Sequence, residues 1–316
     1  MSTLNFPFFP KKEPRKRIPN HFMPLNLQPF FFLFLLSMLS MKISNADPSQ
    51  ITLTIQGSTD QRLINDAFNS NIFQVVVNDV VEASCKETCD KLGGGSNTVI
   101  IKFTGDITNC NDMFNGYEHI TIVNLEHFDA SQVTEMKYMF QGCSNLVTIT
   151  FGNMNTHSVY NMEYLFQKCS KLKTVDFHNL DISGVRKMDF VFAYCPELEE
   201  VSFKSTTPAT LESIQSLFLF CSNLKSVDIS PLKTTDVTDM SSVFKECYSL
   251  TSIIFGDIDT SKVNTMSDMY SNCFKLSSID LSKFVTSSVT NMERMFNGCG
   301  ALKELSLGNF QTANVV

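Results

Sequence analysis

The stretch VTEMKYMFQGCSNLVTITF, residues 133–151, contains the pattern that decides the fold of this 316-residue chain. The same arrangement returns as VTNMERMFNGCGALKELSL at residues 289–307, with Val, Met, Phe, Cys and Leu at the same offsets. Between these two copies the pattern repeats every 26 residues without a gap, so each copy is one structural unit. The cysteine position shows the unbroken spacing, because it holds Cys143, Cys169, Cys195, Cys221, Cys247, Cys273 and Cys299.

Each unit combines two hydrophobic periodicities. Residues 133–143 place apolar side chains at offsets of 0, 3, 6, 7 and 10, the spacing of one apolar face of a short helix. Residues 146–151 end in strict alternation, which predicts a short strand with one buried side. One such unit cannot bury its apolar face alone, so the units must stack. We therefore expect an α/β solenoid of the leucine-rich-repeat type, with parallel strands on the concave face and short helices on the other, wider side.

The repeats also set the expected domain boundaries. Framed on the Val position, eight repeats occupy residues 107–316, and the chain ends just inside a ninth. Residues 47–106 lack the full pattern but contain strand-like and helix-like segments, which predicts an N-terminal cap over the first repeat. No polar cap follows the last repeat, so we expect a truncated C-terminus. Membrane contact is then expected only through a C-terminal anchor outside this sequence.

The first 46 residues have the order of a secretory signal peptide. A basic run at residues 11–17 precedes an apolar stretch at residues 30–41, and the small residues Ser-Asn-Ala follow at residues 44–46. The apolar stretch is shorter than the roughly 20 residues of a transmembrane helix. We therefore predict a signal peptide at residues 1–46 and a secreted or cell-surface protein. A membrane anchor or a spurious upstream extension is the alternative.

Charge and motif content narrow the function classes. Residues 1–46 hold six of the 25 Lys and Arg and one of the 32 Asp and Glu, so the rest of the chain has a net charge of −12. An acidic surface repels phosphate backbones, and we expect no nucleic-acid partner. The sequence contains no G-x-S-x-G, H-E-x-x-H, Walker or G-x-G-x-x-G motif, and its five His share no repeat position. We therefore expect neither an enzyme nor a cofactor.

The ten cysteines fall into two groups. Seven occupy the repeated turn between the predicted helix and strand, where a cysteine packs as a small apolar residue, and we expect buried free thiols. Disulfides between neighbouring turns, or a metal, are the alternatives, although parallel side chains miss disulfide geometry. Cys85, Cys89 and Cys110 lie outside that position, and we expect two of these three to form a disulfide in the cap. The sequence leaves the pair open. No second ligand pair follows Cys85-x-x-x-Cys89 at zinc-finger spacing, so no metal site is predicted.

The outward positions of the predicted strands are the candidate ligand-binding residues. Most carry small polar or acidic side chains, and stacking would bring them side by side on one extended surface. A solvated parallel sheet favours the same residue types, so an ordinary surface role is the alternative. The candidates are Asn124, Thr150, Asp176, Ser202, Asp228, Ile254, Asp280 and Ser306.

The repeated V-x-x-M-x-x-M-F-x-x-C-x-x-L-x-x-[IL]-x-[LF] resembles the BspA-like leucine-rich repeats, in particular their 26-residue Met-Phe-Cys variety of Mycoplasma-type surface proteins. The match covers about residues 107–316 and departs locally at residues 185–236, where Thr206-Thr207-Pro208 replaces the usual turn. The resemblance implies a right-handed solenoid, secreted or on a cell surface, that acts in adhesion or host interaction through a protein or glycan ligand. An intracellular or structural scaffold for protein–protein interaction is the alternative.

Overall fold

The computed structural model describes residues 48–57, 61–203 and 210–316, and Pro48–Val316 form one compact unit. The predicted signal peptide at residues 1–46 lies outside the described residues. Within the described residues the one helix is a short 3₁₀ helix, η1 (Asp66–Asn71), and all other regular structure is β. In that part of the chain, no helix is long and apolar enough to cross a membrane.

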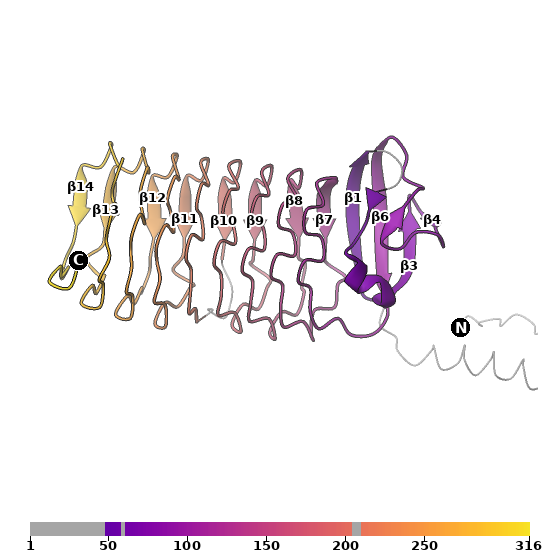
Figure 1. Ribbon diagram of the computed structural model, residues 1–316, viewed down its shortest axis with the longest axis horizontal. Helices are drawn as coiled ribbons and strands as arrows, with labels where there is room; N and C mark the ends of the chain where they lie inside the picture. The colour runs from indigo at the N-terminus through magenta and orange to yellow at the C-terminus, as the bar shows by residue number, and fades with distance from the viewer. Residues whose placement is uncertain (1–47, 58–60, 204–209) are drawn as a thin grey trace, which may run out of the picture. The chain divides into compact units, whose positions relative to one another are not determined.

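The repeats form a β-solenoid in which each 26-residue unit contributes one parallel strand (Figure 1). Paired strands are in register at equivalent repeat positions, as Val201 of β10 lies opposite Val175 of β9. Each repeat is therefore one turn of the coil. The strands are β7 (Ile120–Asn124), β8 (Thr148–Thr150), β9 (Thr174–Asp176), β10 (Glu200–Ser202), β11 (Ser226–Asp228), β12 (Ser252–Ile254), β13 (Ser278–Asp280) and β14 (Glu304–Ser306).

The predicted helices are wrong. Residues 133–143 and their equivalents, which we call the turn side, form consecutive tight turns instead. Every second N–H on this side donates to the next turn of the solenoid, as Phe140 does to the Leu165 carbonyl at 3.0 Å. Two residues per turn adopt a left-handed conformation, such as Tyr138 (φ 59°) and Gly142 (φ 71°). A left-handed residue interrupts an α-helix, so these backbone groups must find partners in neighbouring turns.

The residues of the predicted helix face are nonetheless buried. The phenyl rings of the repeated aromatic position stack through the centre of the coil, with 5.6 Å between the ring centroids of Phe140 and Phe166. Separations along this aromatic column range from 5.4 to 5.8 Å. The column consists of Phe114, Phe140, Phe166, Phe192, Phe218, Phe244, Tyr270 and Phe296.

The absence of helices on the turn side also removes the reason for a concave strand face. A helix is wider than a strand, whereas on this coil the turn side is hydrogen-bonded between successive turns and the strand side within strand pairs. Isolated parallel bridges such as Glu135 with Asn161 connect the turn side in the way that the ladders connect the strands. Figure 1 accordingly shows the turns stacked in a nearly straight row.

An antiparallel sheet covers the first repeat, at the indigo end of the solenoid in Figure 1. Its strand β1 (Gln50–Gly57) pairs antiparallel with β7, so that Leu53 lies opposite Val123. The strand order β4-β3-β6-β1-β7-β8 makes the cap and the first two repeats one continuous sheet. The other cap strands are β2 (Gln61–Arg62), β3 (Ile72–Val77), β4 (Val80–Val81), β5 (Thr88–Cys89) and β6 (Gly95–Phe103).

Candidate binding face on the parallel strands

Each repeat strand directs one side chain inward and two outward. In β9, Val175 is 2% exposed, whereas Thr174 and Asp176 on either side of it are exposed. We call the outward residues of β7–β14 the strand face. The structure places all eight candidate residues there, partly or fully exposed: Asn124, Thr150, Asp176, Ser202, Asp228, Ile254, Asp280 and Ser306.

The acidic candidates have a structural role at the ends of their strands. Oδ1 of Asp228 accepts the N–H of Ser230 at 2.9 Å, which forms an Asx turn. Hydrogen bonds from Ser282 in the equivalent turn lower the pKa of Asp280. The bond to the N–H two residues ahead, at 2.8 to 2.9 Å, is also made by Asn124, Asp176 and Asp280.

The intervening strands β8, β12 and β14 are followed by a left-handed glycine instead. These residues are Gly152, Gly256 and Gly308, with φ between 51° and 63°. A Cβ added to Gly256 would lie 2.4 Å from the Cβ of Ser230 in the preceding turn, so no side chain fits there. Each of these glycine turns therefore packs against the Asx turn of the preceding repeat. The equivalent position after β10 is Lys204, which lies outside the described residues.

This alternation accompanies a division of the strands into pairs. Parallel ladders join β7 to β8, β9 to β10, β11 to β12 and β13 to β14, but among the described strands no ladder joins one pair to the next. The structural period is thus two repeats, or 52 residues. The sequence contains this signal, because Asn or Asp recurs at positions 124, 176, 228 and 280, but a comparison of single repeats misses it.

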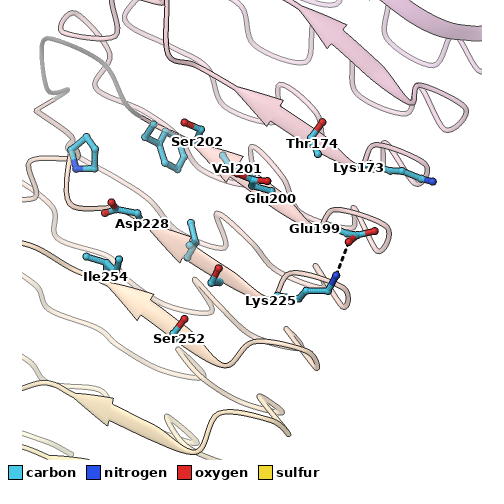
Figure 2. Close-up of a pocket in the computed structure, with 14 residues that line it drawn as sticks. Lys173, Thr174, Glu199, Glu200, Val201, Ser202, Lys225, Asp228, Ser252 and Ile254 are labelled. Carbon is cyan, nitrogen blue, oxygen red and sulfur yellow. Dashed lines mark hydrogen bonds and ion pairs between the residues drawn. The ribbon is translucent and has the colours of Figure 1, made fainter.

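A groove of about 580 Å³ lies on the strand face where two strand pairs meet (Figure 2). It extends from β9 to β12 and therefore crosses the junction between β10 and β11, where no ladder connects the strands. Its outward lining residues are Thr174, Glu200, Ser202, Ser226, Asp228, Ser252 and Ile254.

The two ends of the strands differ in charge across this groove. At the start of β10 and β11, Nζ of Lys225 lies 2.7 Å from Oε2 of Glu199, and Lys173 stands beside that ion pair in Figure 2. Asp228 and Ile254 lie at the opposite ends of their strands. Ile254 is 57% exposed, so it adds an exposed apolar side chain, with Pro231, to the hydroxyl and carboxylate groups of the groove.

The strand face as a whole is acidic. Its two outward positions on each of eight strands hold five carboxylates and no lysine or arginine. The carboxylates are Asp176, Glu200, Asp228, Asp280 and Glu304. Ser and Thr occupy most of the other positions, so the surface combines hydroxyl groups with negative charge.

The seven repeat cysteines are free thiols, six of them buried and Cys299 half-buried. Each Sγ donates to the carbonyl of the aromatic residue 29 positions earlier, as Cys195 does to Phe166 at 3.1 Å. Burial raises the pKa of Cys195 to about 12, which keeps this thiol protonated and unreactive at neutral pH. These cysteines therefore act as packing residues with a weak hydrogen-bond donor.

The remaining cysteines lie in the cap and the first repeat. A disulfide joins Cys85 to Cys89, and Cys110 is a buried free thiol. Burial raises the pKa of the Cys110 thiol by desolvation. Among the residues that the structure describes, no group of three or more His, Cys, Asp or Glu is arranged to hold a metal ion.

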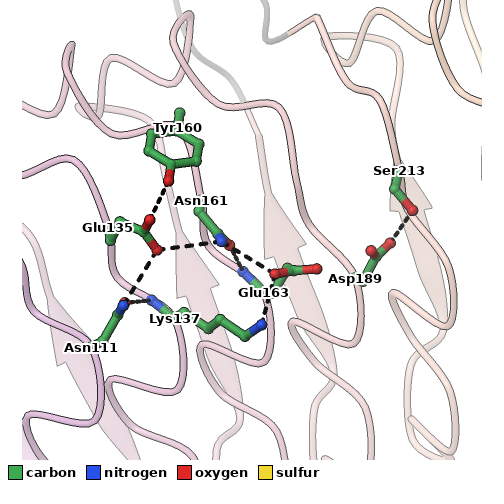
Figure 3. Close-up of polar contacts among 8 residues, drawn as sticks. All are labelled: Asn111, Glu135, Lys137, Tyr160, Asn161, Glu163, Asp189 and Ser213. Carbon is green, nitrogen blue, oxygen red and sulfur yellow. Dashed lines mark hydrogen bonds and ion pairs between the residues drawn. The ribbon is translucent and has the colours of Figure 1, made fainter.

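A polar network on the turn side was not identified from the sequence (Figure 3). Nζ of Lys137 lies 3.1 Å from Oε2 of Glu163, one turn further along. In a separate pair, Ser213 donates its hydroxyl to Asp189, and burial raises the pKa of that carboxyl group. The contacts join neighbouring turns, so the network has a structural role. The other members are Asn111, Glu135, Tyr160 and Asn161.

Comparison with known proteins gives a family but no activity. A leucine-rich repeat protein from Eubacterium ventriosum ATCC 27560, known from a crystal structure, has 20% sequence identity and a TM-score of 0.38. The match covers 61% of this chain and 45% of that protein, so the chain spans less than half of its length. No curated protein is significantly similar in sequence.

The family model matches the solenoid and confirms the resemblance seen in the repeats. It is described as a Mycoplasma protein of unknown function, DUF285, and it matches residues 108–210 and 212–316. These two segments make up more than half of the chain and contain the repeats from the first to the last. The chain belongs to this family, DUF285.

Proposed function

We propose that this protein is a non-enzymatic binding protein, secreted or displayed on the cell surface, that contacts a protein or glycan partner through its strand face. The role proposed for this binding is adhesion or another interaction with a host or the environment. A solenoid offers an extended surface on which many weak contacts add up without a deep cavity. The groove across β9–β12 is the observation that supports this proposal, because it is an open surface feature with mixed polar and apolar lining.

The proposed location outside the cell is supported by two features. The order of residues 1–46 is that of a signal peptide, and the disulfide between Cys85 and Cys89 is of a kind that persists in oxidising compartments. The buried thiols of the repeats favour the alternative, an intracellular scaffold, because free cysteines are common in reducing compartments.

Mass spectrometry of the N-terminus of the protein that cells produce separates these two locations. A first residue of Asp47 is expected for an exported protein. A chain that keeps residues 1–46 would support the intracellular scaffold and count against adhesion.

The strand face is tested with a bulky substitution in the groove. We expect Ser226→Trp, at an exposed position of β11, to reduce binding to a panel of purified extracellular-matrix proteins and glycans. Thr238→Trp is the matched control, because Thr238 is also exposed but precedes a bridge residue on the turn side. If a panel member binds both variants equally well, the strand face is not the binding surface.

A further inference from the structure

The main-chain hydrogen bonds of the strand side alternate with a period of two repeats. Phe177, directly after β9, donates its N–H to the carbonyl of Ser202 in β10 at 2.9 Å. Among the described residues, Phe151 at the same position after β8 makes no such bond to Asp176 of β9. The bond closes each of the four strand pairs at 2.7 to 2.9 Å, with Leu125, Phe177, Ile229 and Leu281 as donors. The equivalent N–H groups of Phe151, Phe203 and Phe255 form no such bond across the three junctions between the described pairs.

The turn side and the core do not share this alternation. Phe244 donates its N–H to the Met269 carbonyl across the junction between β12 and β13, at 2.9 Å. Phe218 makes the equivalent bond to Val243 inside the pair of β11 and β12, also at 2.9 Å. The rings of Phe192 and Phe218 stack at 5.4 Å across the junction between β10 and β11, as closely as any pair in the aromatic column. The junctions are therefore continuous through the core and the turn side and interrupted at the strands.

Exposed ion pairs span two of the junctions on the strand side. Nζ of Lys225 lies 2.7 Å from Oε2 of Glu199 between β10 and β11 (Figure 2), and Nζ of Lys283 lies 3.1 Å from Oδ1 of Asp257 after β12 and β13. All four side chains are exposed, and an ion pair of this kind contributes only about 0–1 kcal/mol. Such contacts are easily broken and re-formed.

Water has access to the same two junctions. Grooves of about 580 and 300 Å³ cross them, the first between β10 and β11 and the second between β12 and β13. Main-chain groups that face a junction without a ladder partner can bond to this water instead. Opening a junction on the strand side therefore breaks no ladder and leaves these groups solvated.

We propose that the solenoid moves as rigid two-repeat units, in which the strand face opens and closes at the junctions and the turn side acts as the hinge. Residues of one pair, such as Asp228 and Ile254, keep a fixed separation. Residues on either side of a junction, such as Ser202 and Asp228, change theirs. The motion adjusts the curvature of the strand face, and it does not depend on what that face binds.

Hydrogen–deuterium exchange resolved to single amides tests whether the junctions are open. Phe151 and Phe177 form a matched comparison, because they occupy the same repeat position and both side chains are buried. We expect the protection factor of the Phe151 amide to be at least about tenfold lower than that of Phe177. Equal protection would show a ladder that continues from β8 to β9, and the inference would fail.

Distances between two nitroxide labels, measured by double electron–electron resonance, test the motion itself. Labels at Thr148 of β8 and Ser278 of β13 span the three junctions on the strand face. Labels at Thr134 and Asn264 lie in the same two repeats on the turn side, and all four positions are exposed. A ketone-bearing amino acid carries each label, so the native thiols do not react. We expect the strand-face distance distribution to be about twice as wide as that of the turn side.

Equal widths on the two sides would show a uniformly stiff solenoid and overturn the inference. A wider distribution on the turn side would overturn it as well, because the hinge would then lie at the strands. Neither result bears on the binding of Ser226→Trp, so this inference and the proposed function fail separately.

Discussion

The strand side and the turn side of each repeat solve the same problem with different backbones. Both bury an apolar row and both form hydrogen bonds between turns, although the strand ladders connect the turns in pairs. The strand side uses three extended residues, whereas the turn side uses consecutive tight turns in which two residues, such as Tyr138 and Gly142, are left-handed. The comparison shows that an apolar pattern specifies which residues face the core, and that a different set of constraints specifies the backbone between them.

The two sides differ in the residue types that adopt the left-handed conformation. The strand side closes its turns with Asx bonds and glycines that permit close approach, as at Gly256 over Ser230. The turn side carries its left-handed conformation mostly on residues with side chains, for example Phe190 and Asp268. These side chains contact their counterparts in the neighbouring turns, as the ring of Phe190 stacks on that of Tyr164 with 4.9 Å between the centroids.

The largest expected effect comes from the aromatic column that both sides share. Phe140 is fully buried between Phe114 and Phe166, so Phe140→Ala should lower the free energy of unfolding by about 3–5 kcal/mol. Urea unfolding followed by circular dichroism measures the change. Tyr160→Ala, at an aromatic residue that is 42% exposed, is the control. A loss below about 1 kcal/mol in Phe140→Ala would contradict the shared core.

The second effect tests the close packing of the glycines that follow the strands. Gly256→Ala puts a Cβ on a left-handed residue (φ 63°) and against Ser230, so we expect a loss of about 2–4 kcal/mol. Gly300→Ala, where a Cβ would meet nothing within 4 Å, should change stability by less than about 0.5 kcal/mol. Similar losses in the two variants, again from urea unfolding, would show that close packing does not select glycine after the strands.

A third effect tests a hydroxyl that joins two turns. Oγ1 of buried Thr260 donates to the Val285 carbonyl and accepts the Val285 N–H, both at 2.8 Å. Thr260→Val removes both bonds without changing the shape of the side chain, and should cost about 1–3 kcal/mol of unfolding free energy. Thermal unfolding should show Thr260→Ser retaining more stability than Thr260→Val. The reverse order would mean that packing, and not hydrogen bonding, sets this position.

The smallest effect has the opposite sign. Tyr270 is fully buried in the aromatic column, and its hydroxyl group has no hydrogen-bond partner among the described residues. Burial raises the pKa of Tyr270 well above its usual range. Tyr270→Phe, which restores the residue type of the other turns, should raise the free energy of unfolding by about 1 kcal/mol. A measured loss of stability would reveal a partner for the hydroxyl group.

The sequence was sufficient for the repeat, its length and the residues of the core. The 26-residue spacing and the apolar offsets identify the buried aromatic column and the inward strand residues such as Val175. It was also sufficient to place the eight candidate residues on one face, because alternation in a strand fixes the direction of each side chain. The prediction of helices was wrong because apolar offsets of 3 and 4 residues also arise in a series of tight turns.

The tertiary structure alone decided how the backbone groups are paired. An N–H of the turn side can donate to a carbonyl of its own segment or to a carbonyl of the next turn. The bond to the next turn forms only when that turn is stacked within hydrogen-bond distance. The same holds for the strand pairs, since the fit of Gly256 over Ser230 depends on two repeats that meet in space. Apolar burial is specified by local spacing along the chain, whereas hydrogen-bond partners and the groove between pairs arise from contacts between turns.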